Sequence, residues 1–578
     1  MKIYIDFEGE RRYFCDPIKI VKTDNPNAIK QQIDEIEKFT DQGYYAVGYL
    51  AYESATGFNL AMKTKSPCKH DAPLVLFGIF DGYSTQQPPY FDDYTPPTFD
   101  LVSDTTIDQY QQKIDYIRQQ IASGNTYQTN YTIKLTAPFN DNPIDYYHFL
   151  QKNNHAGYCA YIEFDNYCIL SISPELFFKL DKQTITTKPM KGTTPRGMSY
   201  QHDEQQLALL MSDKNQAENM MIVDLLRNDL SQISRPGTVH VPKLFTAEKY
   251  PTVWQLTSTV EGQLKPQTNL YQIFQALFPC GSITGAPKTS TMQIIANIEN
   301  SARGVYCGTI GYIEPLKNKA IFNIPIRTLT IHDGQLHYGV GGGITWDSTS
   351  QDEYDEVLAK SAILTRTACT PDAIIESLLL ENGQIWLPDE HLTRLTQSAH
   401  YFDFNCDITN IKQQLAQIAN SYAQGRYKLR IEQPAQGNAL ITIDAISAPM
   451  QINKLAFAPQ CVNSNNVYLY HKTSNRHHFP TLTTGKEYIN FNQNDEITEF
   501  VNGNIVVLIN QQWFTPKISS GLLPGTMRQY YLDNQKILEK TISKNELLQA
   551  EKIAFINSVR KWVEIDNSVF EEFKKAYR

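Results

Sequence analysis

One acidic residue stands on the apolar stripe of a strongly helical stretch of the sequence. Glu218 is followed by apolar residues at the third, fourth and seventh positions, which is the spacing of one helix face. A carboxylate buried on such a face needs a cation or hydrogen-bond donors. A salt bridge to Lys214 or Arg227 would satisfy this need, and so would a metal ion.

A second acidic pair lies far along the chain. Glu353 and Glu356 are three residues apart, so a helix would present both carboxylates on one face. Glu356 also precedes Lys360 by four residues, which is an ordinary ion pair on a solvent-exposed helix. If the carboxylates of the two helices converged with water and an anionic ligand, they would suit Mg²⁺.

A glycine-rich turn, Gly281-Ser-Ile-Thr-Gly-Ala-Pro-Lys288, resembles a phosphate-binding loop only superficially. Ala286 stands in place of the second glycine of that motif, and Pro287 stands in place of its lysine. A glycine turn with Ser282 and Thr284 that leads into a helix still offers free N–H groups and a positive dipole end. The turn therefore suits an anion such as a substrate carboxylate, with plain helix capping as the alternative.

Other motifs exclude several enzyme classes. Gly339-Val-Gly-Gly-Gly343 is not a dinucleotide fingerprint, because Ile344 occupies the last glycine position. The chain contains no H-E-x-x-H and no G-x-S-x-G segment, so zinc proteases and serine hydrolases lack support. Its nine cysteines include no C-x-x-C pair, which argues against a structural zinc site and a disulfide scaffold.

The composition is that of an ordinary globular protein. Of the 578 residues, 41% are hydrophobic and 20% are charged, and the net charge is −9. The acidic balance and the lack of a long Lys/Arg run argue against nucleic-acid binding. No stretch approaches the ~18 apolar residues of a membrane span, and the first ten residues lack the apolar core of a signal peptide. We therefore expect a soluble cytoplasmic protein that binds neither nucleic acid nor membrane.

The elements that must position these residues group into two α+β domains, residues 1–368 and 369–578. In the first, residues 1 to about 80 read as buried strands and residues 83–104 as a loop. The patterns predict helices at 106–123, 203–232, from near Gly281 onward, and about 352–367. They predict strands at 131–137, 158–163, 167–172, 176–180, 305–313, 320–330 and 335–340.

The second domain begins after a seam at Thr370-Pro371. Two apolar strands around Asn382-Gly383 predict a β-hairpin. A helix at 389–402 and strands at 427–432 and 439–446 follow, and a strand-rich half completes the domain.

Several segments of the first domain, spanning about 105–365, together resemble the chorismate-utilising enzymes. This family includes anthranilate synthase component I, aminodeoxychorismate synthase component I, isochorismate synthase and salicylate synthase. Its motifs occur here in family order: Ser173-Pro-Glu-Leu-Phe177, Pro189-Met-Lys-Gly-Thr193 with Thr194-Pro-Arg-Gly197, Glu218 to Leu230, Gly281 to Lys288, Ile326-Arg-Thr328 and Gly341 to Glu356. The resemblance implies a large α+β fold of two antiparallel sheets with helices outside.

Two positions indicate which branch of the family the chain resembles. Gln128 stands where the water-activating isochorismate and salicylate synthases carry a lysine base, and an amide cannot abstract a proton. Ammonia is therefore favoured as the nucleophile. Lys191 stands where anthranilate synthase has alanine and aminodeoxychorismate synthase has lysine, which favours the aminodeoxychorismate branch. A simple counter-ion role for Lys191 is the alternative.

The resemblance also implies a mechanism for the first domain. Mg²⁺ held by Glu218 and Glu356, with Glu353 nearby, would neutralise the ring carboxylate of chorismate. Glu175 would protonate the departing hydroxyl, which requires a raised pKa in a dry site. Lys191 would add to the ring and later be displaced by ammonia, giving 4-amino-4-deoxychorismate.

The same resemblance implies which residues bind the substrate. Its anionic groups would be held by Arg327 and by the turn that carries Ser282 and Thr284. The set of substrate-binding residues implied by the family is completed by Gln128, Gly341 and Gly342.

The C-terminal domain resembles fold-type IV pyridoxal-phosphate enzymes, and aminodeoxychorismate lyases in particular. The matching segments are His391-Leu-Thr-Arg-Leu395 with Ser398-Ala399, Lys472-Thr-Ser-Asn-Arg476, Thr498-Glu499 with Asn504-Ile505, and Gly521 to Arg528. By this resemblance Lys472 is the Schiff-base lysine that also moves protons, and Glu499 pairs with the pyridine nitrogen. Arg394 and the Gly525-Thr526 turn would hold the phosphate of pyridoxal 5'-phosphate.

One position departs from the lyase pattern. The family's late N-S-V-R-G turn reads Asn557-Ser-Val-Arg-Lys561 here. If the family's glycine has a positive φ, the lysine is strained, and substrate orientation by Asn557 and Arg560 is affected.

Taken together, the resemblances imply a fused enzyme that converts chorismate and ammonia to 4-aminobenzoate and pyruvate in the folate route. No cysteine lies in a G-x-C-x-G setting, and Cys280 is interpreted as a packed turn residue. The protein would therefore use free ammonia, or ammonia delivered by a separate glutamine amidotransferase subunit. The alternatives are an anthranilate synthase-type first domain, and a second domain that is a D-amino-acid or branched-chain type aminotransferase. A hypothesis from a different functional class is a regulatory or scaffolding protein whose C-terminal half is inactive.

Overall fold

The computed structural model describes residues 1–67, 72–86, 89–91, 94–367 and 370–577. The chain forms two compact units, and each has sheets and cores of its own. The first unit comprises residues 1–195 and 206–368, and the second comprises residues 196–205 and 369–578.

One sheet of the first unit carries the strands that lead to the glycine-rich segments. Its strand order is β15-β7-β19-β18-β9-β8-β1-β2, with β6 beside β7, and all its pairings are antiparallel. The strands are β1 (Lys2–Phe7), β2 (Glu10–Cys15), β6 (Val102–Ser103), β7 (Gln128–Pro138), β8 (Tyr158–Phe164), β9 (Tyr167–Ser173), β15 (Gly285–Ala286), β18 (Thr328–His332) and β19 (Gln335–Ile344).

The other sheet of this unit is antiparallel as well. Its order is β12-β14-β11-β10-β17-β16-β4-β5-β3, with β13 beside β14. The strands are β3 (Lys19–Thr23), β4 (Tyr45–Leu50), β5 (Val75–Phe80), β10 (Leu176–Asp181), β11 (Thr184–Lys188), β12 (Met190–Pro195), β13 (His240–Lys249), β14 (Val253–Gln263), β16 (Thr309–Ile313) and β17 (Lys319–Asn323).

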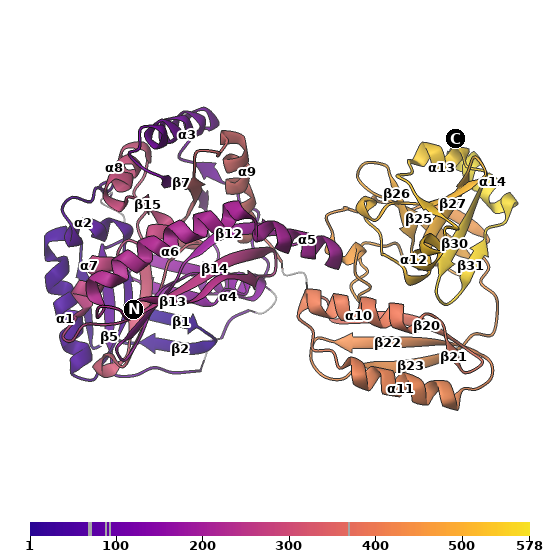
Figure 1. Ribbon diagram of the computed structural model, residues 1–578, viewed down its shortest axis with the longest axis horizontal. Coiled ribbons are helices and arrows are strands. Elements are labelled where there is room, and N and C mark those ends of the chain that lie inside the picture. Colours follow the sequence, from indigo (N-terminus) through magenta and orange to yellow (C-terminus); the bar gives the residue numbers. More distant parts are fainter. Residues whose placement is uncertain (68–71, 87–88, 92–93, 368–369, 578) are drawn as a thin grey trace. The chain divides into compact units, whose positions relative to one another are not determined.

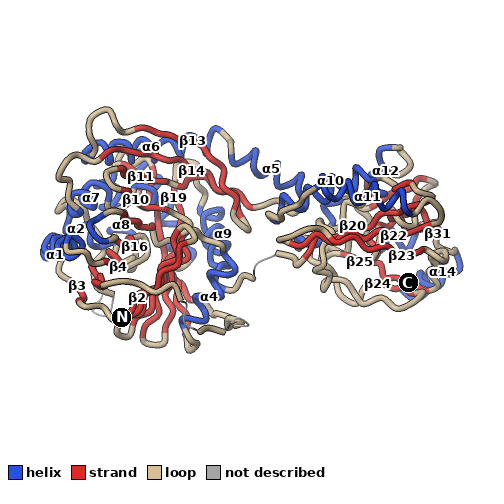
Figure 2. Tube along the Cα trace, turned by 90° about the horizontal axis from the view of Figure 1, so that it is seen from below, coloured by secondary structure: helices blue, strands red, loops and turns tan. Residues whose placement is uncertain are grey.

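The largest core of the unit lies between these two sheets. Side chains alternate along a strand, so β1 sends Ile3, Ile5 and Phe7 into the core shared with the other sheet. Tyr4 on the same strand points to the opposite face, where a second core packs under helices. In Figure 2 the strands of this unit lie between α1 and α2 on one side and α4 and α9 on the other.

The helices of the first unit pack outside the sheets, and Figure 1 shows α3, α8 and α9 together beside β7. The helices are α1 (Ile29–Asp41), α2 (Ala55–Phe58), α3 (Ile107–Ala122), α4 (Pro143–Asn154), α5 (Tyr200–Leu210), α6 (Asp213–Ile233), α7 (Leu270–Leu277), α8 (Lys288–Ile298) and α9 (Ser350–Ser361). The first part of α5 belongs to the second unit.

Two helix predictions need correction. The helix expected over 203–232 is two helices, because Ser212 adopts an extended backbone and begins α6 as its N-cap residue. The helix expected from near Gly281 begins at Lys288. The residues from Gly281 to Lys288 instead form a 3₁₀ turn at Gly281–Ile283 and the short strand β15, which pairs with β7.

The strand expected over 320–330 is also interrupted. It forms β17 in one sheet and β18 in the other, and Arg327 lies between them with a φ of 51°. Helices α1, α4 and α7 were missed by the sequence reading. Their apolar residues were either taken as strands or left without an assignment.

The second unit contains two smaller sheets. The first has the order β21-β20-β22-β23, and the second has the order β24-β25-β26-β27-β28-β29, with β30 joining β27 to β31. Its strands are β20 (Ala373–Glu381), β21 (Gln384–Ile385), β22 (Arg426–Pro434), β23 (Leu440–Ala445), β24 (Lys454–Phe457), β25 (Lys486–Phe491), β26 (Ile497–Phe500), β27 (Asn504–Ile509), β28 (Gln512–Thr515), β29 (Leu538–Glu539), β30 (Lys552–Asn557) and β31 (Lys561–Glu564).

Helices α10 and α11 cover the smaller of these sheets and share a core with β20 and β22. The helices of the unit are α10 (Pro388–Phe402), α11 (Ile408–Ser421), α12 (Thr526–Asp533), α13 (Lys544–Gln549) and α14 (Asn567–Tyr577). The hairpin predicted at Asn382-Gly383 is present between β20 and β21, and both turn residues have a positive φ.

The predicted fold class, α+β with a large two-sheet domain followed by a smaller α+β domain, is confirmed. Among the described residues, no helix combines the length and the apolar character that crossing a membrane requires.

Candidate active sites

Lys191 and Gln128 come together at the end of β19, in the first unit. Lys191 lies on β12 and Gln128 is the first residue of β7. A Cβ atom on Gly343 would lie 2.1 Å from Nε2 of Gln128 and 2.9 Å from Nζ of Lys191. Any larger residue at position 343 would therefore displace both groups. The Oε1 atom of Gln128 is buried and has no hydrogen-bond partner among the described residues.

The surroundings of Lys191 favour its neutral form more than water does. Burial lowers the pKa of its amine, and the nearby carboxylates of Glu218, Glu175 and Glu356 partly oppose this effect. A neutral amine is the nucleophilic form of lysine. Glu218, the helix carboxylate predicted to need a partner, lies near the amine of Lys191, whereas Arg227 pairs with Asp224.

Glu175 is a buried carboxyl group on the loop between β9 and β10. It is 3% exposed, and burial raises its pKa to about 7, against a partial opposing effect of Ser282 and Lys191. The hydroxyl of Ser282 donates to Oε1 of Glu175 at 2.8 Å. The raised pKa that general-acid chemistry requires is therefore present at this position.

The glycine turn is held in place from inside the protein. The hydroxyl of Thr284 donates to the carbonyl of Cys280 at 2.9 Å, within the turn itself. The buried guanidinium of Arg303 donates to the carbonyls of Ile283 and Asn130, and it pairs with Glu299. The sequence reading missed Arg303, since a lone arginine before a strand carries no signal of its own.

The helix that packs against this turn approaches it closely. A Cβ atom on Gly281 would lie 2.2 Å from Cδ2 of Leu225 on α6, so glycine is needed there. The short strand β15 separates the turn from α8. The expectation that the turn leads directly into the positive N-terminal end of that helix is therefore wrong.

The predicted metal ligands Glu353 and Glu356 lie near Gly342 of β19. A Cβ atom on Gly342 would be 3.1 Å from Oε2 of Glu353 and 3.6 Å from Oε1 of Glu356. Burial raises the pKa of Glu353, and the nearby carboxylates of Glu356 and Glu218 act in the same direction. Three acidic residues from two helices are therefore close enough to interact.

The carboxylates alone do not provide a complete set of metal ligands in this arrangement. Lys360 pairs with Glu356 and also donates to the carbonyl of Gly341 at 2.7 Å. No three acidic, histidine or cysteine side chains among the described residues converge well enough to hold a metal ion by themselves. Mg²⁺ takes only one or two protein carboxylates and completes its shell with water and substrate oxygens. The carboxylates of Glu218, Glu353 and Glu356 are therefore suitable ligands for it.

Arg327 is a candidate for binding a substrate carboxylate. Burial lowers the pKa of its guanidinium, and Tyr338 and Tyr250 lie nearby. Within the described parts of the chain, no carboxylate forms an ion pair with Arg327. A largely buried cation in this state is well suited to an anionic ligand.

A cavity of about 620 Å³ in the second unit gathers the residues that the lyase resemblance implies. Its lining includes Ser377, His391, Arg394, Lys428, Lys472, Arg476, Glu499, Asn504, Gly525, Thr526, Asn557, Ser558 and Arg560. Most of its charged groups are cationic, so the cavity suits an anionic ligand.

Lys472 and Glu499 are the two titratable groups on which cofactor chemistry would depend. Burial lowers the pKa of Lys472 to about 8, and the nearby cations Arg394 and Arg476 act in the same direction. Burial raises the pKa of Glu499 to about 8. Its two oxygens accept from the N–H of Leu523 at 3.1 Å and from Nδ2 of Asn504 at 3.2 Å. A protonated ring nitrogen beside Glu499 would favour its ionised form.

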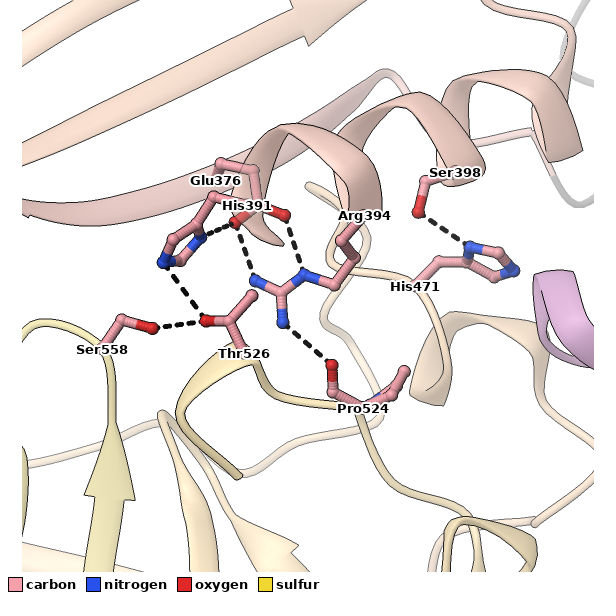
Figure 3. Close-up of polar contacts among 8 residues, drawn as sticks. All are labelled: Glu376, His391, Arg394, Ser398, His471, Pro524, Thr526 and Ser558. Atoms are coloured by element: carbon pink, nitrogen blue, oxygen red, sulfur yellow. Dashed lines mark hydrogen bonds and ion pairs between the residues drawn. The ribbon is translucent and has the colours of Figure 1, made fainter. Parts of the chain in front are cut away.

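Figure 3 shows the polar contacts of four residues that line the cavity, His391, Arg394, Thr526 and Ser558. Arg394 donates through Nε and Nη2 to the buried carboxylate of Glu376, at 2.8 and 2.7 Å. His391 contacts the same carboxylate through Nδ1 at 2.7 Å, and its Nε2 lies 3.2 Å from the hydroxyl of Thr526. Thr526 is the first residue of α12, and Gly525 is its N-cap. The sequence reading did not single out Glu376.

The residues present fit pyridoxal 5'-phosphate. The cavity is lined by the amine of Lys472, the buried carboxyl group of Glu499, and the start of α12 together with the cation Arg394. These groups match the aldehyde, the ring nitrogen and the phosphate of the cofactor, in that order.

Lys561, the residue that departs from the lyase pattern, has a φ of 60°, which is the left-handed conformation that favours glycine. Its ammonium pairs with Glu381 at 3.1 Å and lies over the ring of Trp386. Asn557 and Arg560 remain among the residues that line the cavity, and the side chain of Lys561 is directed elsewhere.

Two family models match the chain, one for each part. The model of chorismate binding enzymes matches residues 5–366, and the model of class IV amino-transferases matches residues 373–567. The resemblance of the first part to chorismate-utilising enzymes is thereby confirmed, and the second part is confirmed as similar to class IV amino-transferases.

The similar proteins cover only part of the chain. Aminodeoxychorismate synthase component 1 of Escherichia coli (strain K12) is 40% identical over 264 residues, which are 46% of this chain and 58% of that protein. The corresponding protein of Klebsiella aerogenes is 41% identical over 254 residues, which are 44% of this chain and 56% of that protein. The chain thus spans a little over half the length of these curated relatives.

A solved structure supports the fold of the first part. Anthranilate synthase component I from Streptococcus pneumoniae TIGR4 superposes with a TM-score of 0.55 and 24% sequence identity, covering 63% of this chain and 92% of that one. At this identity the likeness establishes the fold alone.

Proposed function

Since this chain belongs to the family of chorismate-binding enzymes, we propose that its first unit aminates chorismate to 4-amino-4-deoxychorismate. The observation that carries the proposal is that Lys191, an amine with a lowered pKa, lies near Glu175, a carboxyl group whose pKa is raised to about 7. The first is suited to attack the ring and the second to protonate its leaving group. The similarity to aminodeoxychorismate synthase component 1 supports the same assignment.

The protons of the reaction balance with these two groups. Neutral Lys191 forms a bond to the ring, and the ring hydroxyl leaves as water with the proton of Glu175, which leaves an ammonium adduct and an ionised Glu175. Ammonia then forms the new carbon–nitrogen bond, the amine of Lys191 departs with its electron pair, and the new ammonium group returns a proton to Glu175. Two displacements give net retention of configuration. Gln128 cannot act as a base, so it would not activate a water molecule as a competing nucleophile.

Other residues of the first unit would bind the substrate and the metal. Arg327 is suited to a substrate carboxylate, and Ser282 keeps Glu175 oriented. Gly341 and Gly342 are proposed to contact the ligand through their backbone. Both positions are crowded, because a Cβ atom on Gly341 would lie 2.1 Å from the carbonyl oxygen of Tyr131 and one on Gly342 would lie 3.1 Å from Oε2 of Glu353. Glu218 and Glu356, with Glu353 nearby, would hold Mg²⁺, which supplies positive charge to neutralise the ring carboxylate.

The second unit is proposed to eliminate pyruvate from 4-amino-4-deoxychorismate and so release 4-aminobenzoate. Pyridoxal 5'-phosphate supplies an electron sink when bound. Lys472 would bind the cofactor covalently and afterwards carry protons at its Nζ. Glu499 would hold the proton on the ring nitrogen, and Arg394 with Gly525 and Thr526 would hold the phosphate. The cationic lining of the cavity favours a dianionic substrate.

The nitrogen donor is proposed to be ammonia delivered by a separate glutamine amidotransferase subunit. Cys280 cannot supply this activity, because it is buried and burial raises the pKa of its thiol to about 11. Ammonium salts should therefore replace glutamine when the protein is assayed without a partner.

The test is a product analysis of the full chain. Purified protein is incubated with chorismate, ammonium, Mg²⁺ and pyridoxal 5'-phosphate, and the products are identified by chromatography. Formation of 4-aminobenzoate supports both steps. Accumulation of 4-amino-4-deoxychorismate alone would support only the first and leave an aminotransferase or an inactive domain as the second unit. Formation of anthranilate would overturn the assignment of the first unit.

A further inference from the structure

Behind the proposed phosphate site of the second unit lies a carboxylate that does not itself line the cavity. Glu376 on β20 is 1% exposed, and its two oxygens accept three hydrogen bonds. Two come from Arg394 and one comes from His391 (Figure 3). Both donors line the cavity, so Glu376 contacts a ligand there only through them.

We propose that Glu376 is a positioning residue for the phosphate group of the cofactor, because it fixes the orientation of Arg394, His391 and, through His391, Thr526. This inference rests on the proposed binding of pyridoxal 5'-phosphate by the second unit.

Glu376 holds the guanidinium of Arg394 in one orientation. A guanidinium group is planar, and a carboxylate that binds its Nε and Nη2 together fixes that plane. With these two nitrogens held by Glu376, Nη1 donates to the carbonyl of Pro524 at 3.2 Å, at the turn that leads into α12. The remaining N–H groups of Arg394 are thus directed to the start of that helix, where N–H groups also favour an anion.

His391 connects Glu376 to Thr526. Arg394 and His391 keep the pKa of Glu376 at about 2 despite its burial, so the carboxylate is ionised and can only accept. His391 therefore donates through Nδ1. Burial lowers the pKa of His391, which leaves Nε2 as an acceptor for the hydroxyl of Thr526. Ser558 in turn lies within hydrogen-bond distance of Thr526 and donates to it. One buried carboxylate thus sets the direction of a chain of hydrogen bonds that passes through Thr526 to Ser558. Since the hydroxyl proton of Thr526 is directed to His391, Thr526 would offer its backbone N–H at the start of α12 to the phosphate.

A purely structural ion pair is the competing interpretation. In that case, loss of the carboxylate would loosen the whole cavity and weaken every ligand equally. A positioning role predicts a selective loss, because Glu376 reaches the ligand only through groups at the phosphate end.

The experiment compares two probes on the full-length protein. Binding of pyridoxal 5'-phosphate and of pyridoxal, which lacks the phosphate, is titrated by the visible absorption that develops when each binds the enzyme. Glu376→Gln keeps the shape of the side chain and removes its charge. We expect the Kd for pyridoxal 5'-phosphate to rise about 10- to 100-fold, the scale of lost charge-assisted hydrogen bonds. The Kd for pyridoxal should change less than about threefold on the same scale.

A matched control is Glu487→Gln. Glu487 is also a buried carboxylate of this unit, 2% exposed, but it accepts from the backbone N–H groups of Tyr488 and Val501. Its substitution should leave the ratio of the two affinities at the wild-type value. If Glu376→Gln does not fold, Glu376→Asp carries the same comparison, since it keeps the charge and shortens the reach.

The outcomes separate this inference from the proposed function. If wild-type protein binds neither probe, the cofactor assignment itself fails. If wild-type protein binds both and the substituted protein keeps the wild-type ratio of affinities, the positioning role of Glu376 is overturned. An equal loss of both probes would identify a structural ion pair and would overturn it as well.

Discussion

The amide of Gln128 and the amine of Lys191 lie against the same glycine, Gly343, although 63 residues separate them in the chain. One side chain begins β7 of one sheet and the other lies on β12 of the other sheet. The residue that cannot activate water is thus placed beside the residue proposed to attack the ring. This arrangement leaves lysine as the nucleophilic group at the site.

Replacing Lys191 by alanine should reduce the formation of 4-amino-4-deoxychorismate by at least about a hundredfold, because nucleophilic catalysis is lost. Lys179→Ala is the control, since Lys179 pairs with Glu8 on the surface. Product formation by chromatography measures the effect. Full amination by the substituted protein would remove Lys191 from the mechanism.

The pH profile of kcat/KM for chorismate should be bell-shaped, because the proposed mechanism needs the acid form of Glu175 and the neutral form of Lys191. Burial raises the pKa of Glu175 to about 7, so its acid form is lost above that pH, whereas burial lowers the pKa of Lys191 and its neutral form is gained as the pH rises. On the alkaline limb kcat/KM should decline about tenfold per pH unit. Glu175→Gln should lower kcat/KM at least about a hundredfold and remove this alkaline limb.

A matched control for Glu175 exists in the same unit. Burial also raises the pKa of Glu53 to about 7, but its carboxylate accepts from the backbone of Arg303 and Gly304. Glu53→Gln should leave the midpoint of the alkaline limb in place. A midpoint that moves with Glu53 and not with Glu175 would reassign the acid.

Removal of divalent metal should stop the first reaction only. Chelation with EDTA is expected to abolish amination, because the ring carboxylate loses its neutralising charge, and added Mg²⁺ should restore the rate. The visible absorption of bound pyridoxal 5'-phosphate should not change, because the described cavity of the second unit contains no acidic cluster suited to a metal. Amination that persists after complete removal of metal would contradict the role of Glu218 and Glu356.

Replacing Lys472 by alanine should separate the two activities. Pyridoxal 5'-phosphate would no longer give its visible absorption, and 4-amino-4-deoxychorismate should accumulate without 4-aminobenzoate. Lys486→Ala is the control, because Lys486 lies in the same unit and donates to Tyr488. Continued release of 4-aminobenzoate by the Lys472 variant would exclude its proposed role.

Substitution of Lys561 by glycine should have a small net effect on stability. Glycine relieves left-handed strain of about 1–2 kcal/mol. The change also removes a half-exposed ion pair with Glu381, worth about 0.2–1 kcal/mol, and a contact over Trp386, worth about 0.5–1 kcal/mol. These effects nearly cancel, so we expect a change within about 1 kcal/mol in urea unfolding. Destabilisation well beyond this value would mean that the ion pair ties the turn to β20.

The sequence by itself was sufficient for the local elements with strong periodicity and for the residues within short motifs. The hairpin at Asn382-Gly383 and the strands at 158–163 and 167–172 follow from turn chemistry and from side-chain alternation. The motif order was sufficient for the family of both parts. Periodicity failed at Ser212 and at Arg327, because a chain break depends on which neighbours the segment must pack against.

Only the tertiary structure decided which of these residues meet. Lys191, Glu175, Gln128 and Gly343 lie on separate strands or loops, and their proximity follows from the pairing of strands that are distant in sequence. The same holds for Glu376, whose importance is invisible until β20, α10 and the turn before α12 are packed together. Periodicity specifies the face on which a side chain lies, whereas the burial that shifts a pKa and the partner that orients a charge are created by long-range packing.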